Sequence, residues 1–303
     1  MPSERLIPYL LNQQLQVNHE LNRIDDTWLH ASIVKDYLKD LQRRILDFSN
    51  NLRSQESEAS FNPDRKKEKY TQWVEVMRLA LFQYERFTPG GAALSEGLYS
   101  TLGLLAATWN SINLEKIVVL GCGPGRSVLD FSRLYPSSII EGLDYSLFAL
   151  LLAEKIICGS QGVPLLRRDV YSADYSELLT VPGMNRNNVS FGLMDHAQDM
   201  IPESDMIICS NVLNLLPNHK DVIKRMYSSL RPGGIVVFAD LLGWRLDRES
   251  WRKGICTKDK IATLFSEAGF ITLDQFDGVP YVESESADQF VFYKEHFYVG
   301  RKV

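Results

Sequence analysis

The sequence predicts an α/β fold, in which a helical N-terminal region precedes alternating strands and helices. In the stretch 28–46, apolar residues recur every three or four places, which is the pattern of an amphipathic helix. From Leu114 onward, short apolar strands alternate with helices, as in a parallel sheet that is covered on both faces. We therefore expect a helical region over 1–110 and a sheet domain over 111–303.

The composition is that of an ordinary globular protein, with 303 residues, of which 45% are hydrophobic and 23% are charged. The net charge of −5 argues against nucleic acid as a partner, because phosphate binding relies on basic surface. We see no apolar run long enough to cross a bilayer and no pattern of a secretory signal. The four cysteines stand far apart, without the spacing of metal ligands. We expect a cytoplasmic protein with reduced cysteines and no metal, and neither nucleic acid nor a membrane as partner.

The first 110 residues divide into expected helices that are separated by turn signals. A polar, proline-containing stretch over 54–69 predicts an exposed loop, and helical periodicity resumes over 70–85. The run Thr88-Pro-Gly-Gly then predicts a turn before a further helix over 93–109.

A strand over 116–120 runs directly into three alternating glycines, Gly121, Gly123 and Gly125, and a helix is expected over 126–134. Glycine has no Cβ atom, so the backbone of such a loop can approach a ligand closely. The free N–H groups at the start of the helix suit a polar or anionic ligand group. The dinucleotide-binding pattern G-x-G-x-x-G would need its third glycine where this chain has an arginine. The loop therefore favours a nucleoside cofactor other than a dinucleotide.

A second strand over 138–143 leads to Asp144, and a helix is expected from Ser146 to Cys158. A carboxylate at this point can accept hydrogen bonds from both ribose hydroxyls of a nucleoside cofactor. Together, the G-x-G-x-G spacing and this carboxylate resemble motif I and the following strand of class I S-adenosylmethionine (SAM) methyltransferases. The resemblance implies a Rossmann-like, seven-stranded methyltransferase sheet with SAM as cofactor. It also implies cofactor contacts from residues around the two strand ends, namely Gly121, Cys122, Gly123, Asp144 and Tyr145.

The third strand has two candidate positions in the sequence. The first candidate ends at Asp169, and the second, over 188–195, ends at Asp195. SAM methyltransferases place an acidic residue at the end of this strand, where it accepts a hydrogen bond from the adenine amino group. The second candidate reaches the next strand after about ten residues, as is usual in this fold, so 159–187 becomes an insertion. We therefore expect Asp195 to contact adenine and His196 to lie beside the adenine pocket, while the other aspartate lies in an exposed turn.

The remaining elements complete an alternating sheet. They are a strand over 205–210, a helix over 218–230, a strand from Ile235, a helix over 258–268, and two β-rich stretches over 270–276 and 290–299. The run Arg231-Pro-Gly-Gly is a stop signal for the helix before it. The two closing stretches predict an antiparallel pair, which the methyltransferase version of the fold has and a plain nucleotide-binding fold lacks. Ser210, at the end of the fourth strand, is a further candidate for cofactor contact.

A narrower resemblance, to the carnosine N-methyltransferase-like family, covers about 80–303. It rests on the acidic-aromatic-serine run after the second strand, on paired arginines in the insertion, and on the aromatic closing strand with its terminal Arg-Lys. It also rests on Gln83-Tyr-Glu-Arg86, because that family has a glutamine and an arginine that contact the cofactor in this region. The resemblance implies cofactor contacts from Gln83 and Arg86 and a substrate-side role for Tyr293.

The residues on the expected acceptor side depart from that family. Its substrate-binding aspartate falls on Asn214 and its substrate-side histidine falls on Arg245, which argues against carnosine itself as the substrate. An arginine suits a substrate carboxylate through a bidentate contact; the structural alternative is that Arg245 caps a helix or pairs with Asp247 or Glu249. Asn214 and Asn211 can hold a substrate amine through their amide oxygens, or they cap the short helix that follows.

These features predict a SAM-dependent N-methyltransferase that acts on a small amine, an imidazole compound or a short peptide. A nitrogen acceptor needs only to be neutral and aligned, whereas a hydroxyl acceptor generally needs a base or a metal. Candidate bases are few, because the histidines are expected to be structural. We expect Asn214, Tyr293 and Arg245 to be the catalytic or acceptor-binding residues, with the N-terminal helices as a lid. The alternatives are a natural-product O-methyltransferase and a non-catalytic partner protein that keeps the SAM fold.

Overall fold

The computed structural model describes the sheet domain and parts of the helical region that precedes it. The described residues are 14, 17–18, 21–22, 31–53, 76, 79–81, 83–84, 87, 96–109, 114–168, 176–216, 218–242, 257–284 and 290–303. Arg86, Asp169 and Arg245, which the sequence singles out, lie outside these residues, as does the stretch 54–69.

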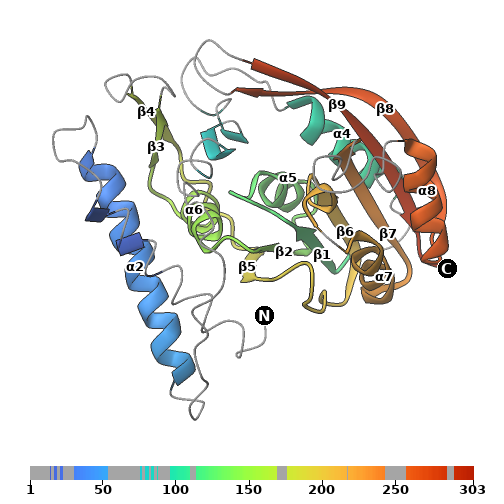
Figure 1. The fold of residues 1–303 in the computed structure, drawn as a ribbon, viewed down its shortest axis with the longest axis horizontal. Helices are drawn as coiled ribbons and strands as arrows, with labels where there is room; N and C mark the ends of the chain where they lie inside the picture. The colour runs from blue at the N-terminus through green and yellow to red at the C-terminus, as the bar shows by residue number, and fades with distance from the viewer. Residues whose placement is uncertain are drawn as a thin grey trace.

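Seven strands form one sheet in the order β5-β2-β1-β6-β7-β9-β8 (Figure 1). They are β1 (Lys116–Leu120), β2 (Ile139–Asp144), β5 (Val189–Leu193), β6 (Ser204–Ser210), β7 (Leu230–Leu241), β8 (Ile271–Ser284) and β9 (Phe290–Arg301). The strands from β5 to β7 in this row are parallel, and β9 runs antiparallel to both β7 and β8. The sheet confirms the predicted seven-stranded fold with its closing antiparallel pair.

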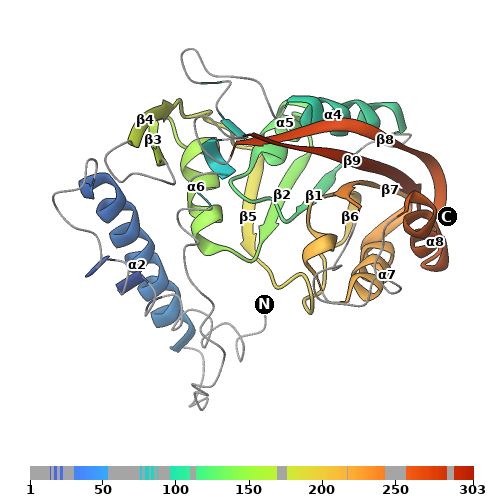
Figure 2. The same cartoon turned by 45° about the horizontal axis from the view of Figure 1, so that its top comes forward.

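Helices cover both faces of the sheet, and each face has its own apolar core (Figures 1 and 2). They are α2 (Ala31–Arg53), α4 (Glu96–Trp109), α5 (Arg126–Leu134), α6 (Leu147–Ile157), α7 (His219–Ser229) and α8 (Lys258–Glu267). Helices α4, α5 and α6 pack on one face, with α2 outside α6, and α7 and α8 pack on the other. Neighbouring residues of β1 divide between the cores, since Val119 joins the first and Val118 the second. Burial on both faces explains why the middle stretches of β1, β6 and β7 are continuous apolar runs.

The third strand of the sheet is β5, the candidate that leads to Asp195. It pairs with β2 in parallel, so that Leu193 lies opposite Asp144. The other candidate forms β3 (Val163–Arg168), which pairs with β4 (Ser176–Val181) in a separate two-stranded sheet beside α6 (Figure 1). The insertion between the second and third strands therefore contributes a hairpin of its own.

One predicted boundary is wrong. The sequence predicts a strand that starts at Ile235, after Arg231-Pro-Gly-Gly, whereas β7 already begins at Leu230. The chain pairs with β6 directly after α7, where Leu230 lies opposite Ser204. The register then shifts before Ile235 pairs with Met206, so the proline and glycines form an irregularity inside the strand.

A second boundary also differs, since the strand predicted over 270–276 is β8, which continues to Ser284. The other described elements of the sheet domain agree with the predicted ranges within a few residues. The helix predicted over 93–109 begins at Glu96, and the helix predicted from Ser146 begins at Leu147. The hydroxyl of Ser146 caps that helix by accepting a hydrogen bond from the N–H of Ala149. In the described part of the chain, no helix is both long enough and apolar enough to cross a membrane.

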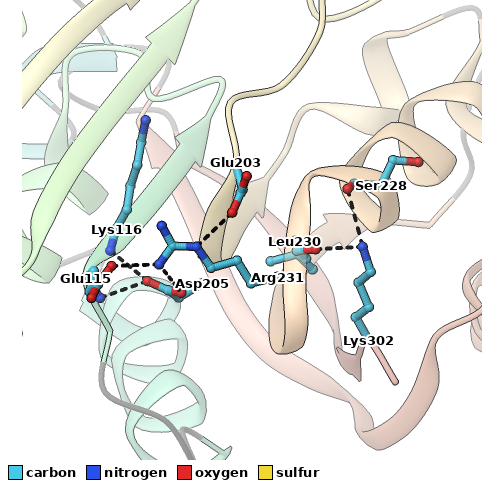
Figure 3. Close-up of polar contacts among 8 residues, drawn as sticks. All are labelled: Glu115, Lys116, Glu203, Asp205, Ser228, Leu230, Arg231 and Lys302. Atoms are coloured by element: carbon cyan, nitrogen blue, oxygen red, sulfur yellow. Dashed lines mark hydrogen bonds and ion pairs between the residues drawn. The ribbon is translucent and has the colours of Figure 1, made fainter.

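At the edge where the parallel strands begin, one carboxylate and one guanidinium tie β1, β6 and β7 together (Figure 3). Asp205 accepts hydrogen bonds from the backbone N–H groups of Glu115 and Lys116, at 2.8 and 2.9 Å. Arg231 donates to the carboxylates of Glu115, Glu203 and Asp205, at 2.8, 2.9 and 3.0 Å. We call this group of residues the amino-edge clamp.

Lys302 fastens the antiparallel strand β9 to the same edge (Figure 3). Its Nζ donates to the carbonyl of Leu230 at 2.7 Å and to that of Ser228 at 3.3 Å. The ammonium also lies 5.0 Å from the centre of the Tyr227 ring. A cation at this place satisfies carbonyls that the end of α7 leaves without partners.

Candidate functional site

The glycine loop connects β1 to α5 at the edge where the parallel strands end. Gly121, Gly123 and Gly125 all have positive φ, at 61°, 53° and 95°. A Cβ at Gly121 would lie 2.1 Å from a methyl carbon of Val212, and one at Gly125 would lie 2.6 Å from Ile157. Close packing and backbone conformation therefore both require glycine at these two positions.

Asp144, at the end of β2, holds the glycine loop in shape. Its Oδ2 accepts a hydrogen bond from the N–H of Gly123 at 2.8 Å, and its Oδ1 accepts one from the N–H of Ser146 at 2.7 Å. A carboxylate has about four lone-pair positions, so both oxygens can accept further hydrogen bonds from ribose hydroxyls. The structure thus adds a loop-holding role for Asp144 to the cofactor role that the sequence predicts.

Cys122 and Tyr145 flank these strand ends. Burial raises the pKa of the Cys122 thiol well above its usual value, so the sulfur stays protonated beneath the loop. The N–H of Cys122 donates to the carbonyl of Leu143, and its carbonyl accepts from the N–H of Gly125. Cys122 therefore shapes the loop through its backbone, while Tyr145 is partly buried against the core that underlies α4, α5 and α6. A direct contact of either residue with a cofactor stays a prediction.

Asp195 lies at the end of the neighbouring strand β5. The N–H of Met194 donates to the carbonyl of Asp144 at 2.9 Å, which brings the two strand ends side by side. The N–H of Asp195 donates to a carboxylate oxygen of Asp199 at 2.7 Å, and this contact closes a turn. The two aspartates predicted to hold ribose and adenine therefore lie at adjacent positions on the same edge.

The ring of His196 is buried in this turn. Within the described part of the chain, neither of its nitrogens has a hydrogen-bond partner. Burial lowers the pKa of the imidazole, although the nearby carboxylates of Asp144 and Asp195 favour its charged form. Arg225 of α7 fixes the turn by donating to the carbonyls of His196 and Asp199, at 2.7 and 2.9 Å. A neutral, buried ring at this place is consistent with the predicted position beside an adenine pocket.

The helical region reaches the glycine loop through Gln83 and Tyr84. The Tyr84 hydroxyl donates to the carbonyl of Pro124 at 3.0 Å, and burial raises the pKa of this hydroxyl well above its usual value. The side-chain oxygen of Gln83 accepts from the backbone N–H of Arg126 at 3.2 Å. Gln83 therefore lies against the loop, and its contact with a cofactor stays a prediction. Arg86 lies outside the described residues.

Arg126 is a buried cation that joins the loop to the helices around it. Its guanidinium donates to the carbonyl of Gln83 at 2.6 Å and pairs with Glu96 at 2.6 Å and with Asp130 at 2.7 Å. It also lies 4.9 Å from the centre of the Tyr99 ring. Burial lowers the pKa of Arg126, but Asp130 and Glu96 outweigh burial and hold that pKa above its usual value. This side chain stands where the dinucleotide pattern has its third glycine, so here that position anchors the helical region.

Ser210, Asn211 and Asn214 follow β6 at the same edge of the sheet. Asn211 has a φ of 54°, a conformation that is uncommon outside glycine and that asparagine tolerates better than most residues. The N–H of Asn214 donates to a carboxylate oxygen of Asp240, which is buried on β7, at 3.1 Å. The short helix η2 (Leu213–Leu215) contains Asn214 itself and has no side-chain cap, so the capping alternative is wrong.

Glu295 of β9 faces the first of these asparagines. The side-chain nitrogen of Asn211 donates to Oε1 of Glu295 at 2.9 Å. Among the described residues, no group donates to Oε2 of Glu295 or to the buried Oδ1 atoms of Asn211 and Asn214. Burial raises the pKa of Glu295 to about 7. The edge therefore holds buried oxygen acceptors without donors.

Tyr293 lies two residues before Glu295 and therefore on the same face of β9. It is paired with Tyr281 of β8, and the two ring centres are 5.9 Å apart. The pairing of β9 with β7 ends at Leu241 and Glu295, so β8 and β9 extend past the end of β7 (Figure 1). The tyrosine pair belongs to this extension. Arg245 lies outside the described residues, and its substrate role stays a prediction.

Comparison with known families now identifies the domain. A family model described as a methyltransferase domain matches residues 93–274, which is more than half of the chain. The chain belongs to this methyltransferase family. With the observed sheet order, this membership confirms the class I SAM methyltransferase fold that the glycine loop and the closing strands predict.

Two curated relatives of the methyltransferase are named trans-aconitate 2-methyltransferase. The relative from Deinococcus radiodurans is 29% identical over 121 residues, which cover 40% of this chain and 36% of the relative. The relative from Methylobacterium nodulans is 29% identical over 119 residues, which cover 39% of this chain and 35% of the relative. The chain thus spans little more than a third of the length of these curated relatives.

A solved structure, that of the 4+2 cyclase SpnF, has a similar fold. It is 16% identical to the methyltransferase, with a TM-score of 0.52 over 76% of this chain and 94% of that one. At this identity the likeness shows the fold alone. These comparisons do not establish the narrower resemblance to carnosine N-methyltransferases.

Sequence reasoning missed three residues that organise the site of the methyltransferase. Glu295 stands between Lys294 and His296 in the middle of a strand whose two halves are largely aromatic and apolar, and this polar interruption is a signal in the sequence. Asp240 directly follows the apolar run of β7, where parallel strands end. Burial raises the pKa of Asp240, and its carboxylate accepts the N–H groups of Asn214 and Leu241. Arg126 breaks a known pattern, but only the structure shows what its side chain contacts.

Proposed function

We propose that this methyltransferase transfers the methyl group of SAM to a nitrogen atom of a small amine, an imidazole compound or a short peptide. Family membership supports methyl transfer. The carboxyl edge of the sheet is the edge where the parallel strands end. Its side chains support the choice of cofactor and of acceptor. Carnosine itself is disfavoured within this class, because Asn214 and Arg245 replace the aspartate and histidine of carnosine N-methyltransferases.

The carboxyl edge fits SAM in the chemistry of its side chains. Asp144 would accept hydrogen bonds from the ribose hydroxyls, and Asp195 would accept one from the adenine amino group, with His196 beside the base. The glycine loop, which no Cβ obstructs, admits close approach of the cofactor to the backbone. When bound, SAM supplies a methyl group on a positively charged sulfur, and this charge is lost from the sulfur on transfer.

The helical region would close over this site as a lid. Tyr84 and Gln83 contact the glycine loop directly. Arg126, which follows the loop, connects the loop to α4 through its ion pair with Glu96. Excluding water in this way favours the reaction, because much of the rate of methyl transfer can come from alignment and desolvation. The free thiols of Cys122, Cys158 and Cys209 are consistent with a reducing compartment, and we propose the cytoplasm.

The observation that carries the choice of a nitrogen acceptor is the group of buried oxygens without donors. These oxygens belong to Asn211, Asn214 and Glu295. A buried polar group that lacks a partner costs about 1–3 kcal/mol, and an acceptor that carries N–H groups would recover this free energy. A carboxylate substrate would bring more oxygen atoms to the same place and would be repelled by them.

An oxygen acceptor is the second candidate. The two curated relatives are named trans-aconitate 2-methyltransferases. Arg245 would suit a substrate carboxylate. A natural-product O-methyltransferase belongs to the same candidate class, and a partner protein that binds SAM without methyl transfer is the remaining alternative.

Transfer of labelled methyl from SAM to a panel of acceptors tests the proposal. The panel contains simple amines, histidine, carnosine, histidine-containing peptides, phenols and trans-aconitate. We expect label on an amine or imidazole nitrogen, and no transfer by the Asp144→Ala variant. Label only on phenols or on trans-aconitate would contradict the nitrogen acceptor. SAM binding without transfer to any of them would favour the partner-protein alternative.

A further inference from the structure

Glu295 is a buried carboxylate at the place where β9 stops pairing with β7. It lies opposite Leu241, in the last residue pair that joins β9 to β7. Its exposed fraction is 0%, although it is an ionisable residue on a strand near the site edge. Carboxylates are seldom buried so completely without a cation or a full set of donors.

The donors around Glu295 satisfy only part of this carboxylate. Oε1 accepts one hydrogen bond, from the side-chain nitrogen of Asn211 at 2.9 Å. In the described part of the chain, Oε2 accepts none, and neither does Oδ1 of the same asparagine. These two unsatisfied oxygens belong to side chains that are themselves joined by a hydrogen bond. Oδ1 of Asn214, which follows in the same loop, is a third buried acceptor without a donor.

Aromatic residues lie on the same face of β9 as Glu295. Tyr293 shares the face of β9 with Glu295, and its partner Tyr281 is buried. Tyr99, on α4, is buried; burial is the main cause that raises the pKa of its hydroxyl, and the charge of Glu295 adds a small contribution. A strand face that carries both a carboxylate and aromatic residues is a suitable environment for an organic cation, because ring faces attract positive charge.

A primary ammonium group matches this arrangement. It carries three N–H donors and no acceptor, whereas the surroundings offer three buried acceptors. We propose that Glu295, together with Asn211 and Asn214, binds the ammonium group of a primary alkylamine and accepts a proton from it before methyl transfer. This inference rests on the proposed N-methyltransferase function and narrows its acceptor to an alkylamine.

The proton has to leave because an ammonium nitrogen has no lone pair. Glu295 takes one proton and becomes a carboxylic acid, which leaves a neutral amine. The nitrogen lone pair then forms the new N–C bond to the methyl carbon, and the S–C bond electrons return to sulfur. The products are an N-methylated alkylammonium ion and a neutral thioether. Glu295 releases its proton to solvent after the methylated amine leaves.

The electrostatic surroundings suit this transfer. Burial raises the pKa of Glu295 to about 7, while its hydrogen bond from Asn211 lowers that pKa. Among the described residues, the titratable groups that interact electrostatically with Glu295 are Asp240 of β7, whose negative charge would oppose ionisation of Glu295, and Tyr99 of α4. A base whose pKa lies near the working pH is efficient in proton transfer.

The test compares wild type with Glu295→Gln, using n-butylamine, putrescine, imidazole and phenol as acceptor probes. Glu267→Gln is the matched control, because it removes a carboxylate from an exposed ion pair on α8. For each protein we would measure SAM affinity by calorimetry, the melting temperature, and kcat/KM from pH 5.5 to 9. Glu295→Asp, which keeps a carboxylate, replaces the glutamine variant if that variant does not fold.

We expect wild type to methylate an alkylamine probe, with kcat/KM rising with pH up to about 7. Glu295→Gln should keep its SAM affinity, lose at least about a hundredfold in kcat/KM, and lose the rise below pH 7. Glu267→Gln should match wild type, and Glu295→Asp should retain part of the activity.

The contrary outcomes separate this inference from the proposed function. Equal kcat/KM and pH profiles for wild type and Glu295→Gln would overturn the role of Glu295 and leave N-methylation standing. Wild type that binds SAM but methylates only imidazole, only phenol or no probe would overturn the alkylamine assignment. Wild type that does not bind SAM would overturn the proposed function and this inference together.

Discussion

The two edges of the sheet carry similar residue types, but they differ in the hydrogen-bond partners that the fold provides for these residues. At the amino edge, Asp205 has a hydrogen bond or ion pair to each oxygen (Figure 3). At the carboxyl edge, Glu295 has a donor for one oxygen only among the described residues. Both carboxylates are buried; Asp205 is the second residue of β6, and Glu295 is in the last residue pair that joins β9 to β7. The difference is therefore in the partners that the fold provides, and not in burial.

This difference separates structural polar groups from groups available to a ligand. A satisfied buried network stabilises the fold, whereas a partly satisfied network is costly unless something else completes it. Asn211 adds to the cost at the carboxyl edge, because its φ of 54° is an unfavourable conformation for most residues. We infer that the amino-edge clamp supports stability and that the carboxyl edge supports binding and catalysis.

The largest expected effect is on cofactor affinity at the carboxyl edge. Asp144→Ala removes the proposed acceptor for the ribose hydroxyls, the hydrogen bond to Gly123 that holds the glycine loop, and the hydrogen bond to Ser146 at the start of α6. Hydrogen bonds to a charged group are worth about 1.5–3 kcal/mol each, so we expect a loss of about 4 kcal/mol in SAM binding. This corresponds to a Kd about a thousandfold higher, which calorimetry would detect. An unchanged Kd would show that the cofactor does not bind at this strand end.

The next effect concerns the pH dependence of stability. The pKa of Glu295 is about 7 in the folded chain, against a usual 4.5. Between these two values the folded state binds more protons than the unfolded state, so this residue makes stability fall as pH rises. Glu295→Gln cannot ionise, so it should gain about 3 kcal/mol over wild type between pH 4.5 and 7. Urea unfolding of both proteins at several pH values measures their free energies of unfolding. A difference between the two proteins that does not change with pH would contradict a raised pKa of Glu295.

At the amino edge, we expect a loss of stability without a loss of cofactor binding. Asp205→Ala leaves the backbone N–H groups of Glu115 and Lys116 without their acceptor. We expect this to cost about 2 kcal/mol of unfolding free energy, because buried donors would be unsatisfied. SAM affinity of the folded variant should equal that of wild type. A SAM affinity that fell as far as in Asp144→Ala would break the division between the two edges.

The smallest expected effect is on kcat/KM for the methyl acceptor. Asn214→Ala removes a buried oxygen that makes no hydrogen bond within the described residues, and keeps the backbone N–H that Asp240 accepts. We expect kcat/KM for the methylated amine to fall about tenfold, or about 1.4 kcal/mol, with an unchanged melting temperature. A lower melting temperature with unchanged kcat/KM would instead assign Asn214 to structure.

Much of the fold follows from local signals in the sequence. The glycine loop, the two aspartates at strand ends and the closing aromatic strands lie where the pattern predicts them. The third strand was ambiguous, because 163–169 and 188–195 both combine apolar residues with a terminal aspartate. Pairing with β2, which is a long-range contact, decides between them.

The missed residues depend on contacts that no local pattern contains. Arg126 pairs with Glu96, which is thirty positions away in the sequence, and Glu295 accepts a hydrogen bond from Asn211, which is eighty-four positions away. The sequence also placed β7 too late, because proline and glycine usually interrupt strands and here form an irregularity within one. Partner identity at such distances follows from the folded chain alone.

The most direct test of the central claim is a crystal structure with S-adenosylhomocysteine and an alkylamine such as n-butylamine. Our account predicts the ribose on Asp144, the adenine near Asp195, and the amine nitrogen within hydrogen-bond distance of Glu295. It also predicts an unchanged amino-edge clamp. A nucleoside bound away from the glycine loop, or an amine that does not contact Glu295, Asn211 or Asn214, would contradict it.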